Sequence, residues 1–248
     1  MNRSAGRLAA VTSGAPAGPA YAVLAEQIRA RILSGDLAPG ARLPAEQELS
    51  ADFGVGRSTV REALRSLASQ NLIQTTRGVS GGSFVSVPTI GHISAHLETG
   101  VALMAAAERV TVAQLMATRH ILEVPAAGEA ALHRTDEHLD DLRRAEFDPA
   151  TAVGEATYAA NQDFHLVLLR ATGNPLLEVI TAPLFRVLGT RFGRDHAPDG
   201  FWACVADDHA ELHDLVAAQD ADGASAAMQR HLGHLTGAYQ QMDRLPRS

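Results

Sequence analysis

The sequence predicts a mainly α-helical protein in two parts: a small N-terminal domain that ends in a β-hairpin and a C-terminal all-α helical bundle. The first observation is that apolar residues recur at three- and four-residue spacing through most of the chain after residue 20. The second is a single Gly-rich turn, near residue 80, between two short β-like segments. The third is length: 248 residues, 46% of them apolar, are enough for two ordinary domains with real cores.

The N-terminal part divides into a tail and a compact domain. Residues 1–19 are mainly Ala, Gly, Pro and Ser without an apolar period, so we expect a flexible tail. An apolar stripe that starts at Tyr21 predicts a helix, which Gly35 ends. Pro88 closes the domain, which we place at residues 20–88. Its other expected elements are helices at Ala45–Asp52 and from Arg57 to about Gln70, and strands at Leu72–Thr76 and Ser83–Val87.

From Thr89 onward the pattern is helical only, which predicts an all-α domain at residues 89–248. Short segments rich in Pro, Gly, Asp and Asn separate the helices. The expected helices span 91–107, 111–133, 136–146, 150–172, 175–196, 202–219 and 221–242.

The two short helices before the hairpin have the layout of a helix-turn-helix. Gly54 stands at the sharp turn, and an apolar seam joins the helices through Leu49, Val55, Val60, Leu64 and Leu67. In such a motif the second helix enters the major groove of DNA, and the hairpin behind it forms a wing. The alternative is an ordinary helical hairpin with a solvated Arg face, which the adjacent wing disfavours. The expected DNA-facing residues are Arg57, Ser58, Thr59, Arg61 and Arg65, with Arg77 and Gly78 in the wing.

Charge and composition exclude several classes of protein. Residues 1–88 carry nine Arg and six acidic residues, whereas residues 89–248 carry twelve Arg and 22 acidic residues, within a net charge of -7. Only the first part is therefore suited to phosphates. A single cysteine, Cys204, excludes an intramolecular disulfide, and the longest apolar run, Val101–Ala107, is too short for a membrane span. We expect a cytoplasmic protein without a membrane partner. The 11 aromatic residues offer no stacking platform for RNA.

Histidines in the helical domain suggest a metal site. Asn161 and His165 are four residues apart and share a helix face, while His209 and His231 fall on the last two helices. Three imidazoles and one oxygen can hold a divalent metal between facing helices. A lone histidine on an amphipathic helix is more often a surface residue. His213 and His234 are alternatives for the inward positions, whereas Asp163 should face away.

The N-terminal motifs resemble a known family. Segments 43–50 (LPAEQELS), 54–64 (GVGRSTVREAL) and 81–85 (GGSFV) resemble the winged helix-turn-helix of GntR-family transcription regulators. The resemblance implies that Arg57, Ser58, Thr59 and Arg61 contact DNA and that the wing tip reaches the minor groove. Two positions depart from the family pattern, where Gln47 replaces a common Arg and Gly56 a common Ser or Thr. These departures are compatible with the fold, but the operator sequence that the protein recognises need not be the one typical of the family.

The helical half is similar to the FCD domain of the FadR subfamily. The similarity rests on 119–123 (RHILE), on 161–174 (NQDFHLVLLRATGN), and on the order of the closing helices, so the whole resemblance covers roughly residues 20–242. It implies a divalent transition metal, Zn²⁺ or Ni²⁺ by preference. The first ligand of the family is commonly Asp, so a neutral Asn predicts weaker binding or a bound anion. The implied ligands are Asn161, His165, His209 and His231.

The resemblance also implies how such a protein works. We expect a homodimeric repressor that binds a pseudo-palindromic operator in double-stranded DNA and is switched by a small organic acid at the metal. Arg119 would pair with a second carboxylate of this effector; the alternative is a structural salt bridge to Glu123. The sequence contains no H-E-x-x-H, P-loop, Ser elbow or GxGxxG, so we do not expect an enzyme. Competing hypotheses are a metal-dependent hydrolase with a nucleic-acid-binding appendage and a metal-free dimerising regulator.

Overall fold

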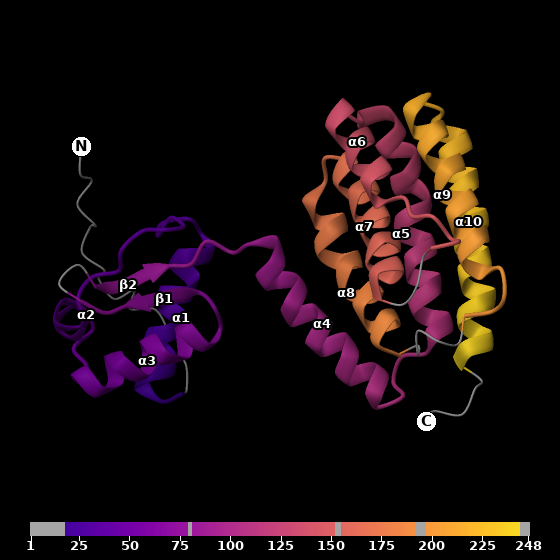
Figure 1. The fold of residues 1–248 in the computed structure, drawn as a ribbon. Coiled ribbons are helices and arrows are strands. Elements are labelled where there is room, and N and C mark those ends of the chain that lie inside the picture. The colour runs from indigo at the N-terminus through magenta and orange to yellow at the C-terminus, as the bar shows by residue number, and fades with distance from the viewer. Residues whose placement is uncertain (1–17, 79–80, 152–154, 192–196, 244–248) are drawn as a thin grey trace. The chain divides into compact units, whose positions relative to one another are not determined.

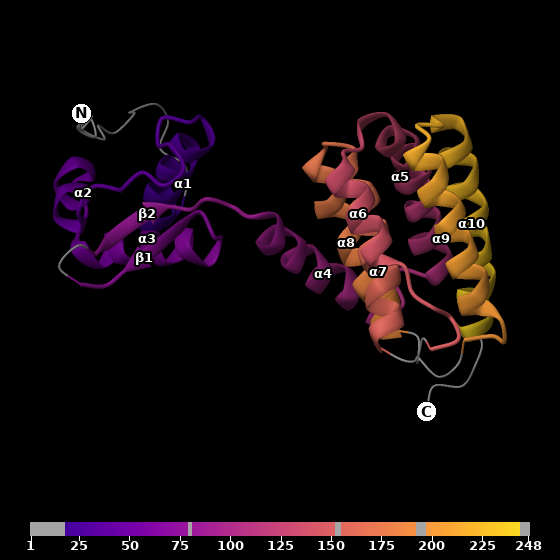
Figure 2. The same ribbon diagram turned by 45° about the horizontal axis from the view of Figure 1, so that its top comes forward.

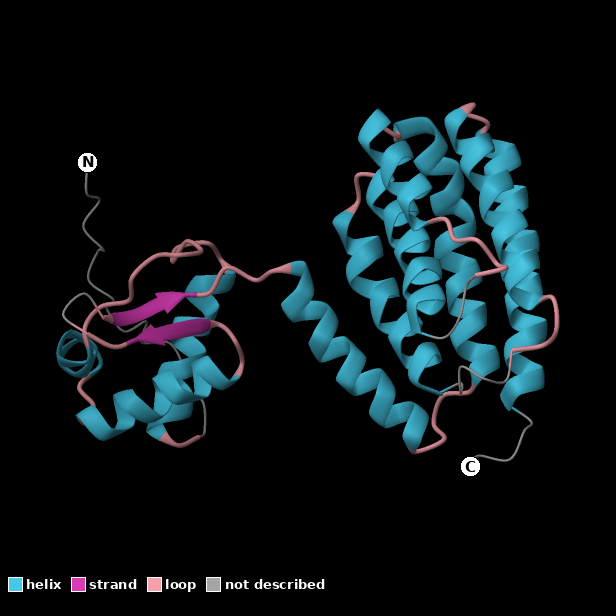
Figure 3. Ribbon diagram, in the orientation of Figure 1, coloured by secondary structure: helices cyan, strands magenta, loops and turns pink. Residues whose placement is uncertain are grey.

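The computed structural model describes residues 18–78, 81–151, 155–191 and 197–243. Most of the expected tail, residues 1–17, lies outside these ranges. The chain forms two compact units, Met1–Pro88 and Thr89–Ser248, and each has its own apolar core. Helices dominate both units, and the strands of the described residues are confined to one two-stranded sheet in the first unit (Figure 3). The expectation of a mainly α protein is confirmed.

The first unit packs three helices against a hairpin (Figure 1). Leu24 and Ile28 on the first helix meet Leu49 on the second and Val60 and Leu67 on the third in one core. Of the predicted apolar seam, only Val55 is partly exposed. The elements are α1 (Ala20–Leu33), α2 (Glu46–Phe53), α3 (Arg57–Ser69), β1 (Ile73–Thr76) and β2 (Gly82–Val85), close to the predicted bounds.

The turn between α2 and α3 depends on Gly54. Its φ of 63° lies in the left-handed region, which glycine adopts without steric cost. The hydroxyl of Ser50 donates to the carbonyl of Val55 at 2.6 Å and closes the turn from the other side. The turn thereby sets the direction in which α3 leaves α2.

The hairpin is an antiparallel pair in which Ile73 faces Val85 and Thr76 faces Gly82. Arg42, from the segment before α2, donates to the carbonyl of Gly81 at 2.6 Å and forms an isolated bridge with Phe84. Strand β2 and Gly81, which precedes it, are therefore tied to the body of the first unit.

The second unit is a helical bundle, in which α5 packs on α7 and α10, and α9 packs on α10 (Figure 2). Thr111 and Thr135 cap α5 and α6 by accepting hydrogen bonds from backbone N–H groups. Its helices are α4 (Ile90–Ala106), α5 (Val112–His133), α6 (Asp136–Ala145), α7 (Glu155–Ala171), α8 (Pro175–Arg191), α9 (Phe201–Ala217) and α10 (Ala221–Asp243).

Two predicted helix bounds, the start at residue 150 and the end at residue 196, differ from the bounds of α7 and α8. The helix expected from residue 150 is α7, Glu155–Ala171, and Ala150 and Thr151 instead lie in a turn after Asp148. The predicted end at residue 196 lies outside the described residues.

Two contacts fix the geometry within the bundle. A Cβ at Gly128 of α5 would lie 2.5 Å from the Ser225 hydroxyl and 3.0 Å from the Ala221 carbonyl, so α5 and α10 approach there too closely for any side chain at residue 128. On the other side, α4 is joined to α8 by the Ser94 hydroxyl, which donates to the Val179 carbonyl at 3.1 Å.

Candidate functional site

The outer face of α3 carries the predicted DNA-contacting side chains. Arg57, Arg61 and Arg65 recur at four-residue spacing and are exposed, because Val60 and Leu64 turn the opposite face into the core. Ser58 is exposed and Thr59 is half-buried. The face is thus free to meet a flat or grooved partner.

The N-terminus of α3 is open as well. Its N-cap is Gly56, and no side chain accepts a hydrogen bond from the first turn. The N–H groups at a helix start favour phosphate when no side chain caps them. An Asp or Ser at this position would compete for the same donors.

The remaining predicted DNA residues surround α3. Arg61 donates through Nε to Glu46 of α2 at 2.8 Å, an ion pair in which both side chains are well exposed. Gln47 is exposed on α2, and Arg77 and Gly78 are exposed at the end of β1. The wing tip, residues 79–80, lies outside the described residues.

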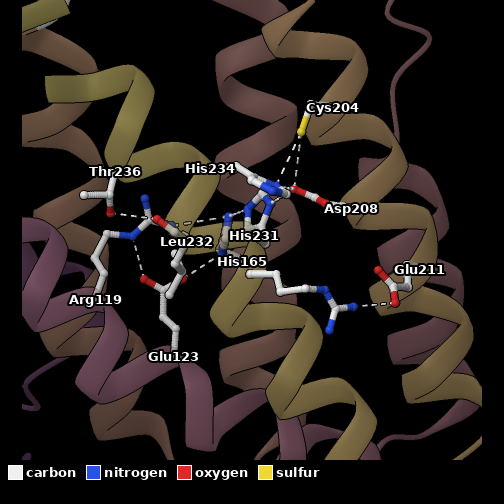
Figure 4. Close-up of polar contacts among 11 residues, drawn as sticks. Arg119, Glu123, His165, Cys204, Asp208, Glu211, His231, Leu232, His234 and Thr236 are labelled. Atoms are coloured by element: carbon white, nitrogen blue, oxygen red, sulfur yellow. Dashed lines mark hydrogen bonds and ion pairs between the residues drawn. The ribbon is translucent and has the colours of Figure 1, made fainter. Parts of the chain in front are cut away.

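Three histidines converge inside the bundle. His165 of α7, His209 of α9 and His231 of α10 are almost fully buried, and their ring nitrogens lie within 4.8 Å of one another. Nε2 of His165 lies 3.1 Å from Nε2 of His231 (Figure 4). Two ligands of one metal ion at 2.0–2.1 Å have about this separation.

The Nδ1 atoms of two of these rings are engaged by carboxylates. His165 Nδ1 lies 2.7 Å from Glu123 of α5, and His231 Nδ1 lies 3.0 Å from Asp208 of α9. A carboxylate accepts a hydrogen bond, so in the neutral rings each Nδ1 carries the proton and each Nε2 keeps its lone pair. The two lone pairs then lie 3.1 Å apart, and Arg119 Nη2 lies 3.3 Å from Nε2 of His165; a cation between the rings would bind both lone pairs.

His209 and Asn161 also carry buried polar atoms that are left unpaired. Within the described residues, neither ring nitrogen of His209 nor Oδ1 of buried Asn161 has a hydrogen-bond partner. Buried polar atoms without partners are costly, and a bound ion or an ordered water would satisfy them. Phe164 stacks on the His209 ring at 3.9 Å, nearly parallel, and thereby fixes its orientation.

Electrostatics keep the three rings neutral. Burial lowers the pKa of His209 well below its ordinary value, and lowers that of His231. Burial also outweighs the Glu123 charge and lowers the pKa of His165 to about 4. Burial alone would raise the pKa of Glu123, but Arg119 and His165 lower it to about 2. The imidazoles are therefore available as ligands without losing protons.

Arg119 connects this cluster to a cavity. Its Nε and Nη2 donate to the two oxygens of Glu123 at 2.6 and 3.1 Å, so the structural salt bridge of the two alternatives is present. The guanidinium edge formed by Nε and Nη2 is therefore already paired with Glu123 and does not offer bidentate pairing to a second carboxylate. Arg119 nevertheless lines a cavity of about 230 Å³ together with Asn161, Phe185 and Tyr239.

The other candidate residues lie outside this group of three rings. The His213 side chain is largely buried beside Asp214, and its Nε2 has no hydrogen-bond partner among the described residues. Asp163 is exposed, as its spacing predicts. His234 is half-exposed and contacts Asp208, the partner of His231. The sequence did not reveal Asp208, which neighbours His209 in the chain but meets His231 only through packing of α9 on α10.

Comparison with known proteins agrees with both units. Residues 20–85 match "Bacterial regulatory proteins, gntR family", and residues 114–234 match "FCD domain". The HTH-type transcriptional regulator LutR of Bacillus subtilis is 31% identical over 212 residues, which cover 81% of this chain and 92% of LutR. The chain belongs to the GntR family of transcriptional regulators.

Other GntR-family proteins extend the comparison. The HTH-type transcriptional repressor NanR of Escherichia coli K12 is 29% identical over 218 residues, covering 86% of this chain and 82% of NanR. A solved GntR structure from Streptococcus agalactiae shares the fold, with a TM-score of 0.60 at 23% identity over 88% of this chain and 99% of that one.

Membership of the GntR family makes the protein a DNA-binding transcriptional regulator with an FCD domain, not an enzyme. The winged helix-turn-helix of residues 20–85 is the DNA-binding part. No described helix is long and apolar enough to cross a membrane.

Proposed function

We propose that the protein is a homodimeric repressor whose DNA binding is switched by a small carboxylate at a divalent metal. Asn161, His165, His209 and His231 hold the metal. The observation that supports this is the convergence of three buried, neutral imidazoles, with the ring nitrogens of His209 and Oδ1 of Asn161 unpaired among the described residues. The NanR relative, a repressor by name, supports the direction of regulation.

The donor set favours Zn²⁺ or Ni²⁺, because imidazole nitrogens suit both and one neutral amide oxygen adds no charge. When bound, the metal attracts a carboxylate. Glu123 and Asp208 orient the rings of His165 and His231 and increase their basicity. The guanidinium of Arg119 adds positive charge at the cavity that reaches Asn161.

The cavity limits the effector to a small molecule. At about 230 Å³ it lies below the usual range for drug-sized ligands, and it is lined by both apolar and polar groups. The four ligands come from α7, α9 and α10, so a bound acid contacts several helices at once. A difference in packing between the bound and free states would alter the spacing of two DNA-binding units in a dimer.

The metal part of the proposal predicts a clear loss on mutation. The full-length protein, purified without chelator and dialysed, should retain at least one Zn²⁺ or Ni²⁺ per chain by elemental analysis. His209→Ala should lower metal affinity by roughly 100-fold or more, because it removes one ligand of four. The control is His133→Ala, an exposed histidine on α5. Equal metal content in wild type and His209→Ala would refute the site.

The DNA part predicts a phosphate or base contact at the start of α3. With duplexes selected from a random pool, Arg57→Ala should weaken binding by roughly tenfold or more and reduce the salt dependence by about one counterion if the contact is to phosphate. Arg143→Ala, exposed on α6, is the matched control. Chelator or a panel of small organic acids should change the affinity of wild type; if none does, the switch is wrong while DNA binding stands.

A further inference from the structure

A second group of metal-type ligands lies on the outer side of the buried histidines. Cys204 and Asp208 are four residues apart on one face of α9, and His234 lies opposite them on α10 (Figure 4). Cys204 Sγ lies 3.4 Å from His234 Nδ1 and 3.9 Å from Asp208 Oδ2, and His234 Nδ1 lies 2.8 Å from the same oxygen. Half of the His234 side chain is exposed, so solvent reaches the group.

Hydrogen bonding alone leaves the thiol poorly satisfied. Asp208 Oδ2 already accepts from His231 Nδ1 at 3.0 Å and from His234 Nδ1 at 2.8 Å. Once Nδ1 of His234 donates to Asp208, it has no lone pair for the Cys204 thiol 3.4 Å away. The remaining contact, from sulfur to Oδ2 at 3.9 Å, is at the outer limit of a hydrogen bond.

We propose that Cys204, Asp208 and His234 form a second site for a borderline-soft divalent cation such as Zn²⁺. With bond lengths typical of zinc, tetrahedral ligands would have a sulfur–nitrogen separation of about 3.6 Å and a nitrogen–oxygen separation of about 3.4 Å. The corresponding distances of 3.4 and 2.8 Å need only small side-chain adjustments. Thiolate, imidazole and carboxylate together favour zinc-like ions over Mg²⁺ or Ca²⁺.

Charge around the group favours a cation over a reactive thiol. Partial burial and the carboxylates of Asp208 and Asp207 raise the pKa of the Cys204 thiol, so without metal it stays protonated. The same negative charge attracts a divalent ion, and on binding the thiol releases its proton to solvent. Glu211, one turn along α9, is engaged by Arg230 at 2.5 Å. The site thus has three protein ligands and a position open to solvent.

Asp208 links this outer site to the buried one. Its Oδ2 accepts from His231, a ligand of the metal under the proposed function, on which this step rests. A cation on Asp208 withdraws electron density from the carboxylate and reduces the basicity of His231. Two cations held on opposite sides of Asp208 also repel each other. Occupation of the outer site therefore weakens metal binding at the inner site.

Cobalt is the probe that separates the two sites. Full-length, metal-stripped, reduced protein is titrated with Co²⁺ and followed by absorption. A thiolate ligand gives a sulfur-to-cobalt charge-transfer band in the near ultraviolet, which nitrogen and oxygen ligands do not give. In wild type we expect this band to saturate at one cobalt per chain. A second cobalt should bind at the inner site without adding to the band.

Variants assign the band to residues. Cys204→Ser should abolish it, and His234→Ala should weaken the cobalt affinity that it reports by roughly tenfold or more, since one of three ligands is lost. His209→Ala should keep the band and lose the inner cobalt. His133→Ala, an exposed histidine of similar accessibility, should match wild type. Asp208→Asn should impair both sites, the inner one by roughly 10–100-fold.

The outcomes distinguish the two proposals. Absence of the sulfur band at saturating cobalt, or its persistence at wild-type affinity in both His234→Ala and Asp208→Asn, overturns the outer site. Cobalt binding that is unchanged in His209→Ala overturns the inner site and leaves the outer one intact. If the two sites are coupled, the inner site of Cys204→Ser should bind cobalt more tightly than the inner site of wild type whose outer site is already occupied. Equal cobalt affinities of the two inner sites would refute the coupling. Circular dichroism verifies that each variant is folded.

Discussion

Glu123 is the residue on which the charge balance of the bundle core depends. It is almost fully buried, accepts two hydrogen bonds from Arg119, and lies 2.7 Å from His165. Arg119 is equally buried and stands 4.5 Å from the centroid of the Phe185 ring. A buried guanidinium that loses its carboxylate is left uncompensated in a medium of low polarity.

Glu123→Gln should therefore be strongly destabilising in metal-free protein. The size of the side chain is kept and the charge is removed, so the expected loss in the free energy of unfolding is about 3–5 kcal/mol. Urea unfolding followed by tryptophan fluorescence measures it. Glu129→Gln, an exposed acid on the same helix, should change stability by less than about 0.5 kcal/mol. Similar losses in both variants would show that Glu123 is not the charge partner of Arg119.

At the scale of elements, α3 owes its presentation to the turn before it and to the absence of a cap at its start. Gly54 supplies the left-handed residue and Gly56 an uncapped N-terminus. The two glycines are two residues apart, yet they serve different physical needs. One is required by the backbone angle, whereas the other leaves N–H groups accessible.

The two glycines should respond differently to alanine. Gly54→Ala meets no atom within 4 Å of the new Cβ, so its whole cost is the left-handed backbone, about 1–2 kcal/mol. Gly56→Ala, at a φ of -67°, should be close to neutral for stability, with its Cβ at an ordinary 3.7 Å from the Ser58 hydroxyl. Thermal unfolding of the first unit by circular dichroism distinguishes them, and equal effects would contradict the assigned role of Gly54.

The helix-turn-helix and the hairpin could be predicted from the sequence, whereas the arrangement of the bundle ligands could not. The helices around the turn follow from local patterns, namely apolar spacing, Gly54 and the Arg repeat on α3, which act within a few residues. The hairpin follows from its Gly-rich turn for the same reason. The ligand set of the bundle was implied by resemblance, because α7, α9 and α10 meet only through long-range packing.

Two site features could not be derived from local patterns. Asp208 contacts a histidine 23 positions away on another helix, and no periodicity reports such a pairing. From the sequence, Arg119 could equally pair with an effector carboxylate or with Glu123, which is four residues further along the helix. Only the structure shows that both side chains are buried together in a salt bridge. Whether Arg119 also contacts an effector stays a prediction.

At the scale of the whole molecule, two separate cores imply two separable stabilities. The proposed metal ligands all belong to the second unit, and so does Trp202, the single tryptophan of the chain, on α9. Trp202 packs edge-on against Phe147 and Tyr158. Its fluorescence therefore reports on the second unit alone.

Removal of the metal should lower the stability of that unit selectively. With free metal at about 100 times its dissociation constant, bound metal contributes about 2.7 kcal/mol, so chelator should shift the Trp202 unfolding transition to lower urea concentration. In a His209→Ala/Cys204→Ser double variant, which lacks a ligand of each proposed site, the two curves should coincide. Superimposable curves for wild type with and without chelator would mean that no tightly held metal supports the bundle.

The close approach at Gly128 bears on how the bundle can rearrange. At this position the Ser225 hydroxyl and the Ala221 carbonyl of α10 face the α5 backbone, and no α5 side chain separates them. Sliding α5 along α10 would bring the larger side chains of α5 against these atoms, so we expect the two helices to move as one unit that carries Arg119, Glu123 and His231 together. A rearrangement of the bundle would then move α7 and α9, which carry His165 and His209, relative to this pair.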